Sequence, residues 1–138
     1  MDDFLPDLIG DLRRDEGFRS KPYRCTAGKL TIGYGRNLDD VGLTEREGAH
    51  LLGNDAVTAI QECRARFAWF DGLSPRRKRA VANMAFNMGI DRLLGFKKML
   101  AALAAGDYDR AADEAQDSAW FHQVGVRGSR VVAMIREG

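Results

Sequence analysis

Residues 14–35 read RDEGFRSKPYRCTAGKLTIGYG, and the pattern changes here from helix to strand. Upstream, apolar residues recur at helical spacing over 3–12, which predicts a short amphipathic helix. Gly17 is expected to end this helix and leaves Glu16 in its last turn, where the helix dipole disfavours a carboxylate. Helix stability therefore does not explain Glu16.

The segment after Gly17 has the residues of strands and turns. Pro22 blocks a helix, and Ala27-Gly28 is typical of a turn. Residues 30–35 place β-branched and aromatic side chains between glycines. We therefore expect a small antiparallel sheet with tight corners that depend on glycine.

A long helix is predicted next. Thr44 and Glu47 have the spacing of a capping box, and apolar residues then recur at helical spacing to about Arg66. At about 1.5 Å per residue this helix is roughly 33 Å long, enough to connect two lobes. Cys63 lies on its apolar stripe and is expected to be a core residue.

The remainder is predicted to be mainly helical. Ser74-Pro75 is an N-cap followed by proline, and it starts a helix that is apolar on more than one face and ends at Gly89. Shorter helices follow, the last over 129–136. Trp69 and Trp120 are interpreted as packing residues.

Together these patterns predict one α+β domain. A small N-terminal lobe with a short antiparallel sheet is joined by a long helix to a mainly helical C-terminal lobe. The predicted bounds are a domain of 1–138, a first lobe of about 13–53, a connecting helix of about 45–66 and a second lobe of about 67–138. That helix 3–12 packs on the second lobe is an expectation from the family resemblance given below.

Composition narrows the function classes. The 21 basic and 20 acidic residues give a formal net charge of +1, which by itself favours neither nucleic-acid nor membrane binding. The aspartate-rich start has no long apolar run, so we expect no signal peptide and no membrane insertion. His50 and His122 are isolated, and no zinc-type spacing occurs, so no metal site is expected. The run 76–79 is basic and raises a nucleic-acid alternative, but a solvated helix face is favoured.

Several ordered blocks carry a family resemblance. They are Arg14 to Arg19, Tyr23, Gly28, Thr31 to Gly35, Arg79 to Gly89, Gly95-Phe96, Ser118 to Phe121 and Arg127 to Arg130. The chain resembles phage-type lysozymes, glycoside hydrolase family 24, over nearly its whole length. The resemblance implies a lysozyme-like fold and an endolysin-type muramidase that cleaves the β-1,4 bonds between N-acetylmuramic acid and N-acetylglucosamine in peptidoglycan. It implies a monomer without cofactor, made in a host cytoplasm and brought to the wall by a holin-like route or from outside.

The resemblance also implies catalytic roles. Glu16 matches the general acid that protonates the leaving sugar oxygen, and we expect it to be buried beside a groove. Thr31 would hold the attacking water. Cys25 stands where many members carry aspartate and others cysteine, so it is either a water-orienting base or a nucleophile. A thiolate forms at neutral pH only if positive charge or hydrogen-bond donors surround the sulfur, and Arg24 or Arg36 could supply the charge.

Substrate contacts follow from the same resemblance. Leu38, Phe86 and Asn87 match cleft positions, although Phe86 could equally be a core residue. Arg127 matches an arginine near the catalytic glutamate and implies electrostatic support. Met99 and Glu114 match further cleft positions but differ in residue type.

One alternative keeps the fold and drops the chemistry. Cys25 replaces the common aspartate, and Arg36 replaces the histidine common at its position. Both departures are compatible with a non-catalytic domain that binds peptidoglycan or acts as a scaffold.

Overall fold

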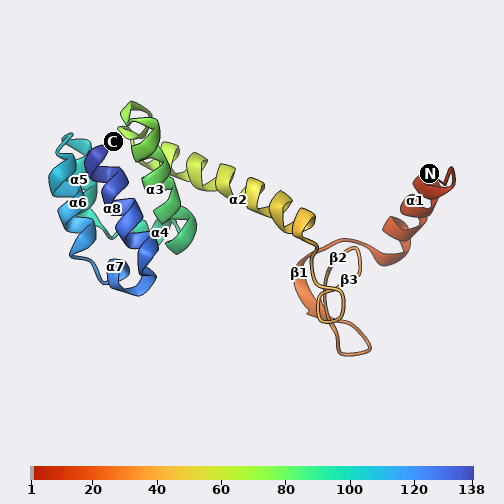
Figure 1. Cartoon of the computed structure of the whole chain (residues 1–138). Helices are drawn as coiled ribbons and strands as arrows, with labels where there is room; N and C mark the ends of the chain where they lie inside the picture. Colours follow the sequence, from red (N-terminus) through yellow and green to blue (C-terminus); the bar gives the residue numbers. More distant parts are fainter. Residues whose placement is uncertain (1) are drawn as a thin grey trace. The chain divides into compact units, whose positions relative to one another are not determined.

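The predicted α+β fold class is confirmed. A computed structural model describes residues 2–138, which divide into two compact units after His50 (Figure 1). The first unit holds one helix and a three-stranded sheet, and the second is helical. Each unit is built from elements that the sequence pattern predicts.

Helix α1 (Leu5–Glu16) opens the first unit. Pro6 stands in its first turn, where a missing N–H costs nothing, and Gly17 ends it with a positive φ of 69°. No residue of α1 is buried, and its apolar stripe is exposed. The predicted packing of helix 3–12 on the second lobe stays a prediction.

The sheet runs in the order β1 (Arg19–Arg24), β2 (Leu30–Gly33), β3 (Arg36–Asn37), with both pairings antiparallel. The β1–β2 register is irregular between Arg19 and Tyr23, the stretch that contains Pro22. Proline has no N–H for the ladder, which accounts for an irregularity here. Thr31 lies on the central strand, opposite Tyr23 on one side and Asn37 on the other.

Helix α2 (Glu45–Arg66) has the bounds that the sequence predicts. Its predicted capping box is confirmed: the Thr44 N–H donates to Glu47 Oε1 at 2.9 Å, and the Glu47 N–H donates to Thr44 Oγ1 at 3.1 Å. Cys63 is 0% exposed, which confirms its predicted core position.

Helices α3 and α6 both pack against α8 in the second unit. Ser74, Asp107 and Ser118 each cap a helix with a side-chain oxygen. The elements are η1 (Phe70–Gly72), α3 (Pro75–Met88), α4 (Ile90–Leu93), α5 (Lys97–Ala104), α6 (Tyr108–Gln116), α7 (Ala119–Val124) and α8 (Val126–Glu137).

The last helix is longer than predicted. The sequence predicts 129–136, but α8 begins at Val126, directly after Gly125, which has a φ of 61°. Gly128 continues the helix because it packs closely on α7: a Cβ there would lie 2.9 Å from the Phe121 ring. This glycine serves close packing rather than helix termination.

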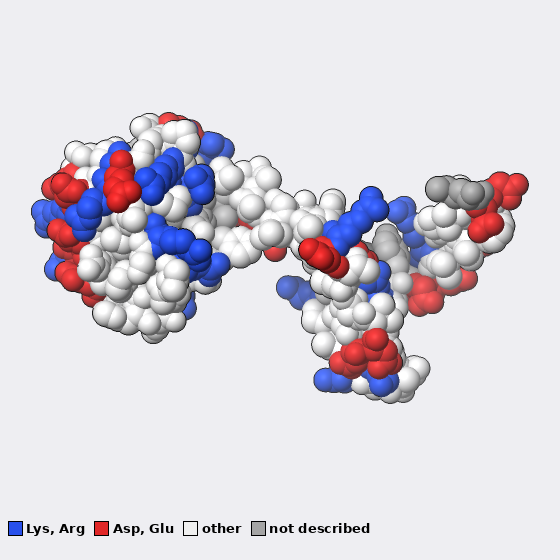
Figure 2. Space-filling view, in the orientation of Figure 1, with Lys and Arg blue, Asp and Glu red and all other residues white. Residues whose placement is uncertain are grey.

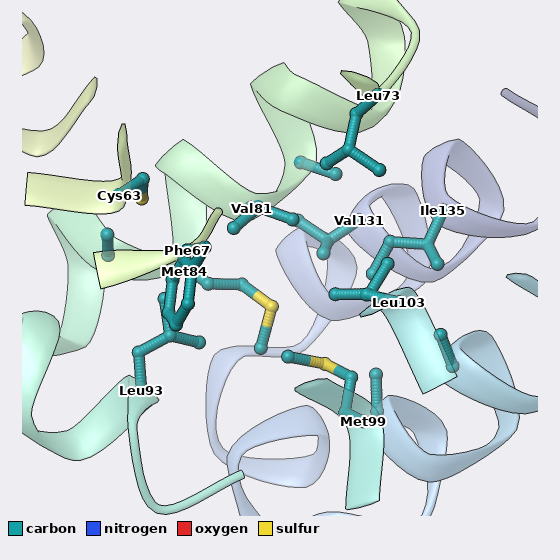
Figure 3. Packing of buried hydrophobic residues seen from close by; sticks show 14 of the residues in the cluster. Cys63, Phe67, Leu73, Val81, Met84, Leu93, Met99, Leu103, Val131 and Ile135 are labelled. Atoms are coloured by element: carbon teal, nitrogen blue, oxygen red, sulfur yellow. The ribbon is translucent and has the colours of Figure 1, made fainter. Parts of the chain in front are cut away.

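The hydrophobic core of residues 2–138 lies in the second unit. Its buried side chains all fall between Ala59 and Ile135. Figure 3 shows the side chains of Met84 and Met99 extending toward each other at the centre of the cluster. Trp120 is 5% exposed and Trp69 packs against the cluster, which confirms both as packing residues.

The visible surface carries both charge signs. Figure 2 shows basic and acidic side chains interspersed over the second unit. In the described part of the chain, no helix combines the length and apolar character needed to span a membrane.

Candidate active site

Glu16 lies against a glycine turn at the end of β2. A Cβ placed on Gly35 would lie 3.0 Å from Glu16 Oε2, so the absence of a side chain at Gly35 makes room for the carboxyl group. Gly35 has a φ of 81°, a conformation that favours glycine. The carboxyl group at the helix end therefore lies close to the β2–β3 turn.

Within the first unit the Glu16 side chain is exposed, and its predicted burial beside a groove stays a prediction. The turn at Gly35 covers only one side of its carboxyl group. The first unit by itself places this carboxyl group next to the sheet.

Cys25 and Thr31 are brought together by a tight turn. The Gly28 N–H donates to the Cys25 carbonyl at 2.8 Å, and the Cys25 N–H donates to the Lys29 carbonyl at 3.0 Å. Thr31 Oγ1 also donates to the Lys29 carbonyl, at 2.9 Å. Thr31 is 4% exposed and Cys25 is half-buried, so the thiol lies at the edge of the sheet beside the threonine hydroxyl.

The turn favours the thiolate form of Cys25. Hydrogen bonds donated to the sulfur by the backbone N–H groups of Lys29 and then Ala27 lower the pKa of the thiol. A hydrogen bond with the Thr31 side chain acts in the same direction, while partial desolvation opposes it. A lowered pKa raises the thiolate fraction at neutral pH.

Two sources of this effect were expected, positive charge and hydrogen-bond donors, and the second is the one found. The lowering of the Cys25 pKa comes from hydrogen bonds and not from the charge of Arg24 or Arg36. Arg24 Nη1 donates to the Gly28 carbonyl at 3.1 Å, and Arg36 is paired with Glu47. Both guanidinium groups are therefore occupied elsewhere.

Asp39 is a residue of this site that the sequence did not reveal. Its Oδ2 accepts the Leu30 N–H at 2.8 Å and lies 3.8 Å from Arg24 Nη1. The only sequence signal is a carboxylate shortly after a short strand, which is too common to indicate a role. Leu38, its neighbour, is half-buried, and its N–H donates to the Leu30 carbonyl at 2.7 Å.

Phe86 and Arg127 line one groove of the second unit. The groove has a volume of about 500 Å³, with an apolar floor that includes Ile60 and Ala82. Phe86 is 44% exposed, so the structure places it at the surface and not in the core. Arg127 is half-buried on α8.

Asn87 has a structural partner. Its Oδ1 accepts a hydrogen bond from Trp120 Nε1 at 2.8 Å, while the rest of the residue is exposed on α3. Its amide NH₂ group is thus the part that could contact a ligand.

Met99 and Glu114 line a second groove. This groove has a volume of about 520 Å³ and also includes Trp120 and Gln123. Met99 is 1% exposed and forms the floor, whereas Glu114 is half-buried. Met99 and Glu114, which match family cleft positions but differ in residue type, therefore line the same groove.

The basic run 76–79 is partly occupied within the unit. Arg77 Nε donates to the Ile135 carbonyl at 2.7 Å, and Arg76 pairs with Glu137 at 3.1 Å. Two of the four cations thus hold the end of α8, which favours a structural interpretation over nucleic-acid binding. Across residues 2–138, no group of three or more His, Cys, Asp and Glu side chains is arranged to hold a metal ion.

Comparison with known proteins gives one family. A family model described as phage lysozyme matches residues 13–136. The endolysin of Acyrthosiphon pisum secondary endosymbiont phage 1 is 32% identical over 75% of this chain and 70% of that protein. Probable T4-type lysozyme 1 of Dictyostelium discoideum is 29% identical over 92% of both chains.

A further relative is a much longer protein. The pre-baseplate central spike protein Gp5 of Enterobacteria phage T4 is 31% identical, over 92% of this chain but 27% of its own length. This chain therefore spans about a quarter of that spike protein.

Proposed function

Since the chain belongs to the phage lysozyme family, we propose that it is an endolysin-type muramidase. The proposed substrate is bacterial peptidoglycan, and the bond cleaved is the β-1,4 link between N-acetylmuramic acid and N-acetylglucosamine. The main structural support is the pair of Glu16, held against Gly35, and Cys25, held beside Thr31, in one unit.

Glu16 is proposed as the general acid. Its carboxyl proton moves to the glycosidic oxygen while the bond from that oxygen to the anomeric carbon breaks, and the electron pair leaves with the oxygen. The remaining sugar carries oxocarbenium character at the anomeric carbon. The Glu16 carboxyl group is exposed and therefore open to a bulky polymeric substrate.

Cys25 and Thr31 are proposed to handle the second half of the reaction. As a base, the Cys25 thiolate takes a proton from a water that Thr31 orients, and the water oxygen bonds to the anomeric carbon. As a nucleophile, the sulfur itself bonds to that carbon and water later displaces it. The lowered thiol pKa supports both routes, and they differ in whether a glycosyl-enzyme can be trapped.

The sugar contacts are proposed at Leu38, Phe86 and Asn87, with Arg127 as electrostatic support for Glu16. Exposure of Phe86 and the free amide group of Asn87 are compatible with ligand contact. An aromatic face and an amide group with a free N–H suit a carbohydrate, because sugars offer both C–H surfaces and hydroxyl groups.

Mass spectrometry of digested peptidoglycan tests the function. The wild-type protein should release muropeptides with N-acetylmuramic acid at the new reducing end, and Glu16→Gln should release none while keeping its circular dichroism spectrum. Undiminished digestion by Glu16→Gln would refute the assignment of the acid. Asp15→Asn, one residue away and exposed, is the matched control and should digest normally.

A scaffolding or wall-binding role is the second candidate. The similarity to a spike protein favours it, since that relative is named for a structural part. Sedimentation with purified peptidoglycan separates the two: binding without any released muropeptide favours the scaffold, and release favours the enzyme.

A further inference from the structure

We propose that Asp39 is a positioning residue for Cys25, because it holds the 25–29 turn in the conformation that directs backbone N–H groups at the Cys25 sulfur. Its Oδ2 accepts the Leu30 N–H at 2.8 Å, directly after the turn. The contact crosses from the loop after β3 to the start of β2. It therefore fixes where the turn rejoins the sheet.

Two further contacts hold the same turn, and we call the three contacts made by Asp39, Arg24 and Thr31 the clamp. Arg24 Nη1 donates to the Gly28 carbonyl at 3.1 Å, and the same nitrogen lies 3.8 Å from Asp39 Oδ2. On the other side, Thr31 Oγ1 donates to the Lys29 carbonyl at 2.9 Å. Carbonyl groups of the turn are thus held from outside, and the turn N–H groups of Lys29 and Ala27 are the ones that lower the pKa of the thiol.

The charged groups around the turn affect Cys25 by holding the turn in place and not by their charge. Besides Arg24 and Asp39, they are Lys29, which pairs with Asp40 at 3.2 Å, and the Arg36–Glu47 pair beyond β3. The shift in the Cys25 pKa arises from hydrogen bonds and burial and not from any of these charges. A carboxylate acting by charge alone would raise the thiol pKa, because it repels a thiolate.

The two explanations therefore predict opposite signs. Without the clamp, the turn N–H groups no longer hydrogen-bond the Cys25 sulfur and the pKa of the thiol rises. Cys25 of Asp39→Ala should therefore be alkylated more slowly at neutral pH. If Asp39 acted only as a nearby negative charge, its removal would lower the thiol pKa and speed alkylation. Asp39→Asn keeps an oxygen acceptor for the Leu30 N–H and should restore most of the wild-type rate.

Iodoacetamide alkylation across pH 5 to 10, followed by peptide mass spectrometry, measures this. We expect a several-fold slower reaction of Cys25 at pH 7 in Asp39→Ala, with a pH profile displaced to higher pH. Asp40→Ala is the control, since it removes an equal charge whose contacts are the side chains of Lys29 and Asn37. Buried Cys63, whose pKa burial raises to about 11, serves as the unreactive reference in the same sample.

Faster or unchanged alkylation of Asp39→Ala overturns the proposal. If that variant fails to fold by circular dichroism, Asp39→Glu replaces it: the charge stays, the acceptor moves by one methylene, and only the clamp predicts slower alkylation. The link to catalysis rests on the proposed function. Thiol reactivity needs no substrate, so an inactive protein with the predicted profile would refute the function and leave the clamp standing.

Discussion

Arg36 and Glu47 form a two-pronged ion pair that joins β3 to the first turn of α2. Arg36 Nη1 donates to Glu47 Oε1 at 2.8 Å, and Nη2 donates to Oε2. Arg36 Nη1 also donates to the Gly42 carbonyl at 3.0 Å, so the loop between the two elements is held as well. This pairing lowers the pKa of Glu47 to about 2, with help from the Thr44 N–H, and raises the pKa of Arg36.

The ion pair predicts acid sensitivity of the first unit. Glu47 binds its proton near pH 4.5 when unpaired and near pH 2 in the fold, so its stabilising effect is present above about 4.5 and is lost as the pH falls toward 2. The free energy of unfolding of the first unit, measured with urea between pH 2 and 6, should fall as the pH falls from about 4.5 toward 2. Glu47→Gln should flatten this slope, and an identical slope in both proteins would contradict the prediction.

Gly35→Ala should reduce lysis more than Gly33→Ala does. Both glycines have positive φ values, 81° and 70°, so alanine costs about 1 kcal/mol or more of backbone strain at either site. Only at Gly35 would the new Cβ meet Glu16 Oε2, at 3.0 Å; at Gly33 nothing lies within 4 Å. Lysis rates compared at equal concentrations of folded protein separate the effect of displacing the Glu16 carboxyl group from a loss of stability. Equal losses of activity in the two variants would contradict a role for the position of this group.

Arg77→Met should destabilise the second unit by about 2 kcal/mol, because the half-buried guanidinium donates to the carbonyls of Ile135 and Arg136 at 2.7 and 3.0 Å. Arg76→Met is the control. Its pair with Glu137 is largely solvated and should be worth about 0–1 kcal/mol. Urea denaturation of the two variants provides the test, and similar losses would show that the caps of α8 contribute nothing special.

Asn87→Ala should cost about 1–3 kcal/mol, since it leaves the Nε1–H of buried Trp120 without its acceptor. Asn87→Asp keeps an acceptor and should lose less. Thermal unfolding measures the structural part, and hydrolysis rates at varied peptidoglycan concentration measure substrate contact. An alanine variant as stable as the wild type would show that water replaces the amide oxygen.

Local signals in the sequence predicted the elements well. The capping box at Thr44 and Glu47 and the N-cap at Ser74 each depend on residues three positions apart, so their hydrogen bonds follow from the helix itself. Periodicity then carried α2 to its end at Arg66. Such features need no knowledge of the tertiary structure.

Contacts between distant residues could not be predicted. Asp39 meets the Leu30 N–H only because β2 and β3 pair in one register, and Asn87 meets Trp120 only once α3 and α7 are packed. The N–H groups that lower the Cys25 pKa, those of Lys29 and Ala27, are close in sequence, but the conformation of the turn decides which N–H groups act on the sulfur. Backbone N–H groups leave no trace in residue identity, whereas a neighbouring arginine suggests charge at once.

The uneven distribution of buried apolar side chains has a kinetic consequence. Amide protons exchange through local opening, and segments with few buried contacts open at low free energy. In residues 2–138 the segment before Ala59 contains one buried residue, Thr31. Amide protons of β1–β3 should therefore exchange with deuterium well before those of α3, α6 and α8. The sheet would open locally while these helices stay folded.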